Sequence, residues 1–221
     1  MSESPLVAHV VFRLGPVPFT EPVVTTWAVG AVLVLLAWLA TRSRAEVPAR
    51  GQAVAEIVVE TLLSQMREIL HADPRPLLPL VGTLFLLILS CNLAALIPGA
   101  HSPTGSLETP LALSLVVLVS VQGMGLWTRG PLGWARSFVS PTPLLLPLHL
   151  MSEVTRTLSM AIRLFGNSMS HELVLAVIVS LAGLLVPVPL QLLGLLIGLV
   201  QAYIFAVLAT VYLGGAIGQE E

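Results

Sequence analysis

Five long apolar stretches limit this chain to one class of fold. They cover residues 23–40, 77–97, 111–127, 144–186 and 190–213. A helix needs about 20 apolar residues to cross the ~30 Å hydrocarbon core of a bilayer. Only 10% of the 221 residues are charged, against about 25% in an ordinary soluble domain. The pattern predicts an all-α polytopic membrane protein with about five membrane-crossing helices.

The longest stretch, residues 144–186, exceeds what one upright crossing requires. As a continuous helix it would measure ~65 Å at about 1.5 Å per residue, twice the hydrocarbon thickness. It must therefore tilt steeply, bend or break. We count it as a single crossing, and Pro187 and Pro189 then turn the chain back into the last span.

Outside the spans, residues 1–22 are expected to form an N-terminal extramembrane segment, and residues 23–221 a single membrane domain. Residues 46–71 place apolar side chains at helical spacing, with charged residues between them. This predicts an amphipathic helix on the cytoplasmic side, which either lies in the membrane interface or docks on a partner subunit. Residues 98–110 and 129–143 are expected to be loops.

The placement of arginines predicts the orientation. The segments 41–76 and 129–143 carry seven arginines between them, whereas residues 98–110 carry none. Positively charged loops remain in the cytoplasm. Five crossings then place the N-terminus outside and the C-terminus in the cytoplasm. The arginines that decide this are Arg42, Arg44, Arg50, Arg67, Arg75, Arg129 and Arg136.

Residues 152–172, SEVTRTLSMAIRLFGNSMSHE, carry ionisable groups inside an apolar region. Such groups cost at least ~2.5–3.5 kcal/mol each at membrane depth, so they are functional candidates by default. Arg163 is permanently charged and needs an anion or a water-filled cavity nearby. Glu172 lies nine residues later, on the opposite face of a helix. One face of the same helix carries Arg156, Ser159, Arg163, Asn167 and Ser170.

Other polar residues have both a functional and a structural interpretation. His171 and Glu172 form an adjacent titratable pair that could pass protons on. Asn167 and Ser159 could line an aqueous path or satisfy backbone groups. Gln201 lies within an apolar run and needs a hydrogen-bonding partner there, for transport or for helix packing. Cys91, the single cysteine, is expected to be a packing residue.

Several function classes find no support. The chain has no Gly-rich phosphate loop, no HExxH or CxxC motif and no nucleophile elbow. A net charge of −2 gives no indication of nucleic-acid binding. We expect no cofactor and no resident metal, and the sequence assigns no ligands to a transient Na⁺. The chain is therefore expected to move an ion rather than to carry out bond chemistry by itself.

Three segments make the chain recognisable. TLSMAIRLFGNSMSHELVLAVI closely resembles the SLxxRLFGNxxxxEL signature of the subunit a family of rotary F-type ATP synthases. VQAYIFAVLATVYLGGAI resembles the last helix of that family, and PLLPLVGTLFLLILSCNLAALIPG resembles an earlier span. The resemblance covers residues from about 77 to the end of the chain. It implies a stator ion channel whose last two helices form a tilted hairpin around a rotor.

The resemblance also implies roles for single residues. Arg163 matches the essential arginine, which faces the carboxylates of the rotor c-ring and keeps ions from passing directly between two offset half-channels. Glu172 matches a half-channel carboxylate, and Gln201 matches a glutamine opposite the arginine. Asn167 and Ser159 match positions of the same motif, and His171 lies at a variable position. The implied partners are the rotor c subunits, the peripheral-stalk b subunits and the rest of the complex, in a bacterial-type inner membrane.

The chain departs from the family pattern at two places. The family usually shows PTxDxNxT before the third span, whereas PTGSLETP at residues 103–110 lacks the aspartate and the asparagine. Gly194 stands where some members carry a titratable partner for the half-channel. These differences leave proton and sodium coupling both open. The alternatives to the stator function are a stand-alone secondary ion transporter or channel and a structural membrane scaffold.

Overall fold

The structure, a computed structural model, describes residues 10–14, 17–41, 50–70, 73–95, 102–139, 146–182 and 187–217. Within these residues, two short strands come first and six α-helices follow. The strands are β1 (Val10–Leu14) and β2 (Val17–Thr20). The helices are α1 (Glu21–Thr41), α2 (Arg50–Leu70), α3 (Leu78–Ala94), α4 (Glu108–Val139), α5 (Leu146–Ala182) and α6 (Pro187–Ile217), with a 3₁₀ helix, η1 (Pro103–Gly105), before α4.

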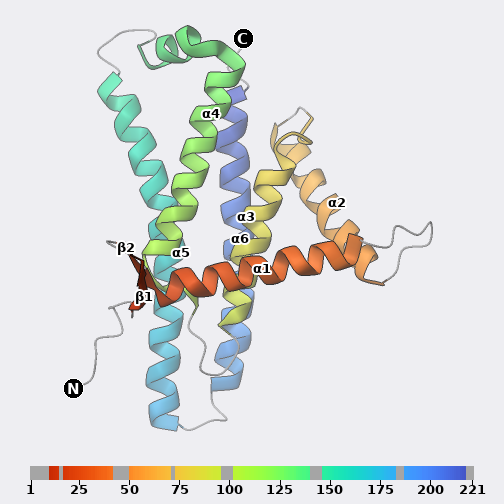
Figure 1. Cartoon of the computed structure of the whole chain (residues 1–221), viewed down its shortest axis with the longest axis vertical. Helices are drawn as coiled ribbons and strands as arrows, with labels where there is room; N and C mark the ends of the chain where they lie inside the picture. The colour runs from red at the N-terminus through yellow and green to blue at the C-terminus, as the bar shows by residue number, and fades with distance from the viewer. Residues whose placement is uncertain are drawn as a thin grey trace.

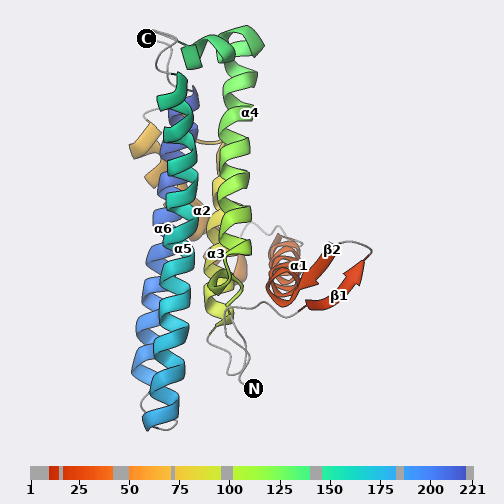
Figure 2. The same ribbon diagram turned by 90° about the vertical axis from the view of Figure 1, so that its left-hand side faces the viewer.

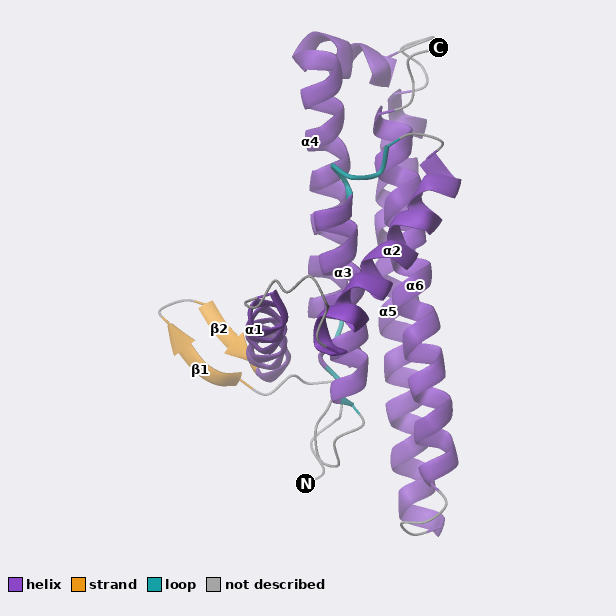
Figure 3. Cartoon of the chain, turned by 90° about the vertical axis from the view of Figure 1, so that its right-hand side faces the viewer, coloured by secondary structure: helices purple, strands orange, loops and turns teal. Residues whose placement is uncertain are grey.

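Helices α3 to α6 lie side by side along the long axis of the molecule and form a bundle (Figures 1 and 2). All four contribute to one apolar core, in which Ile88, Val117, Leu164 and Phe205 are each at most 2% exposed. Helix α1 runs across this bundle and is seen end-on in Figure 3.

The five predicted spans all correspond to helices, so the all-α polytopic class is confirmed. Helices α1, α4, α5 and α6 are long and apolar enough to cross a membrane, and α3, with 17 residues, is a shorter apolar helix. Helix α5 is continuous over 37 residues, so residues 146–182 contain none of the breaks that their length would allow.

Helix length limits how the bundle can sit in a bilayer. Helix α5 measures ~55 Å at about 1.5 Å per residue, far more than a ~30 Å hydrocarbon core. Helix α1, with 21 residues, measures ~31 Å and fits an upright crossing. Helix α1 runs across the direction of α5 and α6 (Figure 1). If α5 and α6 are strongly tilted from the membrane normal, α1 can therefore lie closer to that normal in the same membrane.

The prediction of a loop over 129–143 is wrong for residues 129–139, which belong to α4. Gly130 and Pro131, inside the predicted loop, produce a kink in α4. Gly130 adopts φ +69°, a conformation that a residue without a β-carbon reaches easily. A short helical segment follows and folds over the end of the bundle where α6 finishes (Figure 1). Likewise, α4 begins at Glu108, inside the predicted loop 98–110.

The N-terminal segment contains a β-hairpin to which the sequence analysis had assigned no strand. Strands β1 and β2 are antiparallel, with Leu14 paired to Val17 and Val10 to Thr20. Residues 1–9 lie outside the described residues, as do Arg42 and Arg44 of the orientation argument. The division at residue 22 remains a prediction.

The amphipathic helix predicted at 46–71 corresponds to α2. Leu62 and Met66 on its apolar face are buried, and the Tyr203 hydroxyl of α6 donates a 2.7 Å hydrogen bond to Gln65 Oε1. The C-terminal part of α2 therefore docks on α6 of the same chain. Ile57, earlier in α2, is 63% exposed and leaves an apolar surface for lipid or another subunit.

Candidate functional site

Helix α5 carries its polar side chains on two sides. Its inner face is apolar, with Met160, Ala161 and Leu164 buried in the bundle. Its outer face carries the predicted polar stripe, in which Arg156 is half-buried and the remaining members are exposed. Those exposed members are Ser159, Arg163, Asn167 and Ser170.

Arg163 projects from the outer face of α5. Among the residues that the structure describes, its guanidinium makes no hydrogen bond and no ion pair. Glu153, a carboxylate earlier on the same helix, is paired with Arg156 instead, at 3.4 Å. Ser159 is one turn away on the same exposed stripe and does not line the hollow described below. Arg163 is thus available to an anion on another chain.

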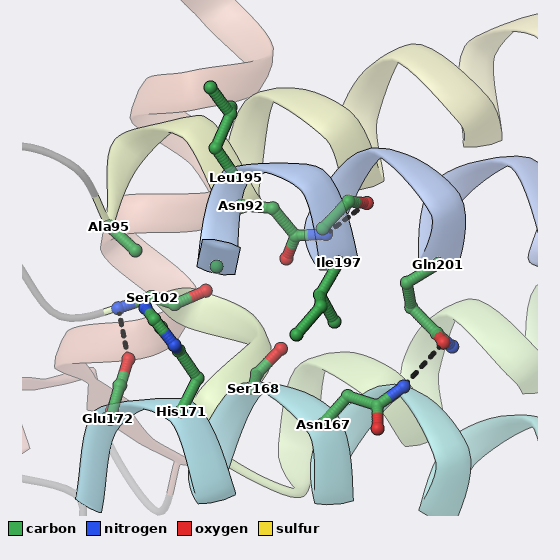
Figure 4. A pocket seen from close by; sticks show the side chains of 12 residues that line it. Asn92, Ala95, Ser102, Asn167, Ser168, His171, Glu172, Leu195, Ile197 and Gln201 are labelled. Carbon is green, nitrogen blue, oxygen red and sulfur yellow. Dashed lines mark hydrogen bonds between the residues drawn. The ribbon is translucent and has the colours of Figure 1, made fainter. Parts of the chain in front are cut away.

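Glu172 faces the connection between α3 and α4. Its Oε1 accepts a hydrogen bond of 2.7 Å from the backbone N–H of Ser102 (Figure 4). The carboxylate lies so close to Gly105 that a β-carbon there would be 2.9 Å from Oε2. The glycine of the PTG segment therefore permits this approach, and Glu172 and the loop are held together.

His171 points toward α6 and packs against Gly194. A β-carbon built at Gly194 would lie 2.2 Å from two atoms of the imidazole ring. No side chain at position 194 is compatible with this position of the ring. The imidazole thus occupies the space in which some family members are expected to carry their titratable partner.

A chain of hydroxyl and amide groups connects α3, the η1 segment, α5 and α6. Thr104 Oγ1 lies 2.6 Å from Ser102 Oγ and 2.8 Å from Ser168 Oγ, and it donates to Asn92 Oδ1 at 3.0 Å. Asn92 Nδ2 in turn donates to the carbonyl of Gly198 at 3.0 Å. These polar groups lie among apolar helices, and the sequence analysis did not identify them as site residues.

Gln201 finds its partner on α5. Asn167 Nδ2 donates to Gln201 Oε1 at 2.7 Å, and the glutamine is only 3% exposed (Figure 4). The expectation that this amide needs a partner is met by Asn167, one turn from Arg163. Cys91 is fully buried in α3, and its carbonyl accepts from Ser102 Oγ at 3.4 Å.

These groups surround a hollow of about 30 Å³ between α3, α5 and α6 (Figure 4). A single water needs ~10–15 Å³ of such space, so about two water molecules fit. His171, Glu172, Asn167 and Gln201 all line it. The structure therefore brings together four of the six predicted site residues, and it leaves Arg163 and Ser159 on the outer surface.

An apolar layer closes the interior beyond this hollow. Leu164 of α5 and Ala202 and Phe205 of α6 are at most 1% exposed and belong to the same packed cluster. They lie at the level of Arg163 along the two helices. The polar hollow thus ends at this packed apolar layer, and the exposed Arg163 lies at the same level of α5.

Comparison with known proteins agrees with this geometry. The family model described as "ATP synthase A chain" matches residues 23–214. The chain belongs to the ATP synthase A chain family. It is 47% identical to "ATP synthase subunit a 2" of Bradyrhizobium sp. (strain BTAi1) over 218 residues. This alignment covers 99% of this chain and 98% of that relative. It is also 37% identical to "ATP synthase subunit a" of Legionella pneumophila (strain Philadelphia 1), over 100% of this chain and 96% of that protein.

The chain belongs to the ATP synthase A chain family, and four helices in the part that the structure describes are long and apolar enough to cross a bilayer, so it is an integral membrane protein. Its departure from the family's PTxDxNxT pattern has a structural counterpart. Glu108, at the place of the asparagine, accepts a hydrogen bond from the Thr20 hydroxyl at the end of β2. Ser106, at the place of the aspartate, bonds to the Pro103 carbonyl at 3.0 Å. Neither lines the hollow, where Glu172 is the one carboxylate among the described lining residues.

Proposed function

We propose that this chain is the ion-conducting stator subunit of a rotary ATP synthase or ATPase. In this function a monovalent cation, H⁺ or Na⁺, reaches Glu172 through the polar hollow and passes to a carboxylate on the rotor c-ring. The observation that carries the proposal is the exposed Arg163, which has no partner among the described residues and lies beside a closed apolar layer.

The cost of an unpaired guanidinium supports this assignment. A charge at membrane depth costs at least ~2.5–3.5 kcal/mol, and arginine cannot lose its proton to avoid that cost. A rotor carboxylate opposite Arg163 would supply the missing anion. It would be held deprotonated there, so it would release its ion on one side of the arginine and take up another on the other side.

The polar hollow supplies groups suited to the ion's passage. Glu172 and His171 can each accept and release a proton, and the Thr104 and Ser168 hydroxyls can both donate and accept hydrogen bonds. The same oxygens are ligands that Na⁺ would accept. The Asn167–Gln201 pair holds α5 to α6 next to Arg163 and thereby keeps the exposed face in place.

The remaining partners and the orientation belong to the same proposal. The chain would assemble with c subunits, peripheral-stalk b subunits and the rest of the complex in a bacterial-type inner membrane. The C-terminal ends of α2, α4 and α6 lie at one end of the bundle (Figure 1). Arg67, Arg75 and Arg129 are near these ends, which supports a cytoplasmic C-terminus and an outside N-terminus.

Ion uptake by the whole reconstituted complex tests the proposal. Arg163→Ala should hydrolyse ATP without ATP-driven ion uptake. Ile162→Ala, which changes a neighbouring side chain that is 52% exposed, should retain uptake close to that of the wild type. Normal uptake by the assembled Arg163→Ala complex would exclude the stator function and favour a scaffold.

A further inference from the structure

Residues 131–139, the last part of α4, form a helical segment that lies across the end of the bundle (Figures 1 and 2). Gly130, with φ +69° and ψ 170°, ends the long part of α4, and Pro131 follows it. Proline favours the first position of a helix, because the N–H that it lacks would have no partner there. The chain therefore changes direction at Gly130 and begins a second helix.

The kink lies where α4 is expected to leave the hydrocarbon core. Residues 109–128 carry no charge and are bounded by Glu108 and Arg129. At about 1.5 Å per residue they measure ~30 Å, which is the thickness of a typical hydrocarbon core. This uncharged part of α4 fits one crossing, so that Gly130 lies at the boundary between the acyl chains and the headgroups.

Contacts within the chain hold one side of segment 131–139. Trp134 Nε1 donates a 3.0 Å hydrogen bond to Gln122 Oε1 on the long part of α4. The same indole packs against Gly125, where a β-carbon would lie 3.4 Å from the Cδ1 atom of the ring. The segment is thus fixed in its position across the bundle, and Trp134 belongs to its inner side.

Arg129, immediately before the kink, joins this segment to α6. Its Nη2 donates to the carbonyl of Ala216 at 3.0 Å and to that of Gly215 at 3.5 Å. A β-carbon at Gly133 would lie 3.1 Å from Arg129 Cβ, so the start of the segment packs closely on the arginine. The segment and the C-terminal end of α6 are therefore held together.

The outer side of the kink presents two large apolar side chains. Trp127 is 82% exposed and Leu132 is 87% exposed, which makes them the most exposed large apolar side chains of α4 among the described residues. Tryptophan prefers the membrane interface, since its ring is apolar while its N–H can bond to water or headgroups. Residues 129–139 also carry two arginines and no acidic residue, a charge that suits lipid phosphates.

We propose that residues 127–139 form a membrane-surface anchor, in which Trp127 and Leu132 insert into the headgroup–acyl boundary of a phospholipid leaflet. The leaflet is the one on the side of the α6 C-terminus. Interfacial helices of this kind lie in the plane of the membrane with their apolar side ~5–10 Å deep. Through Arg129, the anchor holds the end of α6 at a constant depth. This role does not depend on the stator function proposed above.

The position of the two side chains favours lipid over a second protein chain as the occupant of this face. They flank the kink, at the level where the uncharged part of α4 ends, so a bilayer around the bundle reaches them without any further subunit. The segment also runs across the bundle and hence along the bilayer surface (Figure 1). A spanning helix of a partner would run along α4 instead.

Depth measurements on the intact complex in phosphatidylcholine nanodiscs test the anchor. In a cysteine-free background that includes Cys91→Ala, nitroxide labels are attached to Trp127→Cys and Leu132→Cys. Relaxation of each label by oxygen and by a water-soluble nickel complex reports its depth. Val119→Cys, on a side chain of α4 that is 68% exposed, gives the reference for the hydrocarbon core.

Both labels should relax more with oxygen than with the nickel complex, and both should lie at nearly the same depth, shallower than the reference. A straight continuation of α4 would instead place position 132 ~7.5 Å further out than position 127. A label at 132 that relaxes mainly with the nickel complex would place the segment in water and overturn the proposal. Labels shielded from both reagents would indicate a second protein chain on this face and would also overturn it.

Hydrogen exchange in the same nanodiscs gives a second measurement, which needs no cysteine. Leu132→Glu puts a carboxylate at the interface, so amides of residues 131–139 should exchange several-fold faster. Exchange over residues 213–217 should rise with them, because Arg129 links the two segments. Leu132→Phe is the matched control and should exchange as the wild type does. Since Leu132 is so exposed, it has little packing within the chain to lose, and equal exchange in the two variants would overturn the anchor.

Discussion

The His171 imidazole occupies the space that a side chain at Gly194 would require. A β-carbon at Gly194 would lie 2.2 Å from two ring atoms, so any side chain at this position would force the imidazole out of the place that it occupies. The imidazole of the hollow is thereby placed on α5, directly before the Glu172 carboxylate. This pair of residues explains how the chain can lack a side chain at 194 and still present an imidazole to the hollow.

Gly194→Ala should destabilise the packing of α5 on α6. Overpacking of this kind typically costs ~1–3 kcal/mol. Gly30→Ala is the matched control, because nothing lies within 4 Å of a β-carbon there. The heat-induced loss of this subunit from the solubilised complex measures the effect. The double variant His171→Ala/Gly194→Ala should recover part of the loss, and strictly additive effects would contradict the steric account.

The Asn167–Gln201 pair predicts a strongly coupled double-mutant cycle. Asn167→Ala leaves the buried Gln201 amide without its partner, which costs ~1–3 kcal/mol. Gln201→Leu removes that amide and should make a subsequent Asn167→Ala change much less costly. The same heat-stability assay on the single and double variants measures the coupling. If the two substitutions destabilise the subunit independently, each amide stabilises the packing of α5 on α6 without the other, which would contradict this prediction.

Arg129 is expected to stabilise the C-terminal end of α6. Its Nη2 donates to the carbonyl of Ala216 at 3.0 Å, where the unpaired carbonyls of a helix end carry partial negative charge. Loss of such a cation costs ~0.3–1 kcal/mol, so Arg129→Ala should speed hydrogen exchange over residues 213–217 a few-fold. Arg67→Ala removes an exposed arginine of α2 and serves as the control. Equal exchange in both variants would exclude the capping role.

Arg163→Lys should lose most of the ATP-driven ion uptake although the charge is conserved. An ammonium group is a compact, strongly hydrated charge, whereas guanidinium presents a planar set of donors that fits a carboxylate. Uptake per ATP hydrolysed, compared with wild type and Arg163→Ala, measures the difference. Full activity of the lysine variant would indicate that charge alone suffices at this position.

The parts of the fold and site that could be predicted are those with a high energetic cost in a membrane. Arg163 stands out because its charge cannot be neutralised, and Gln201 because a buried amide needs a partner. Asn92 carries the same signal within the third helix and could have been found by the argument used for Gln201. The exposed position of Arg163 could not be predicted from spacing alone, since that depends on which helices pack against α5.

Other features left no distinct signal. Ser102, Thr104 and Ser168 are small, and hydroxyls in membrane helices often bond to nearby backbone carbonyls, so their contacts with one another required the loop geometry. The Gly130-Pro131 pair is typical of a turn, yet it only kinks α4 because the positive φ is confined to one residue. The β-hairpin before α1 consists of strands of five and four residues, too short for a clear alternation.

The central claim is that the exposed stripe of α5 around Arg163 faces the rotor carboxylate. Disulfide cross-linking in the intact complex tests it, with Cys91→Ala as background, Ser159→Cys in this chain, and a cysteine one helical turn from the rotor carboxylate. A disulfide requires Cα atoms within ~4.4–6.8 Å. The account predicts a cross-linked product and a loss of ATP-driven ion uptake that reduction reverses. No product from Ser159→Cys, together with efficient cross-linking of Val154→Cys on the opposite side of α5, would contradict it.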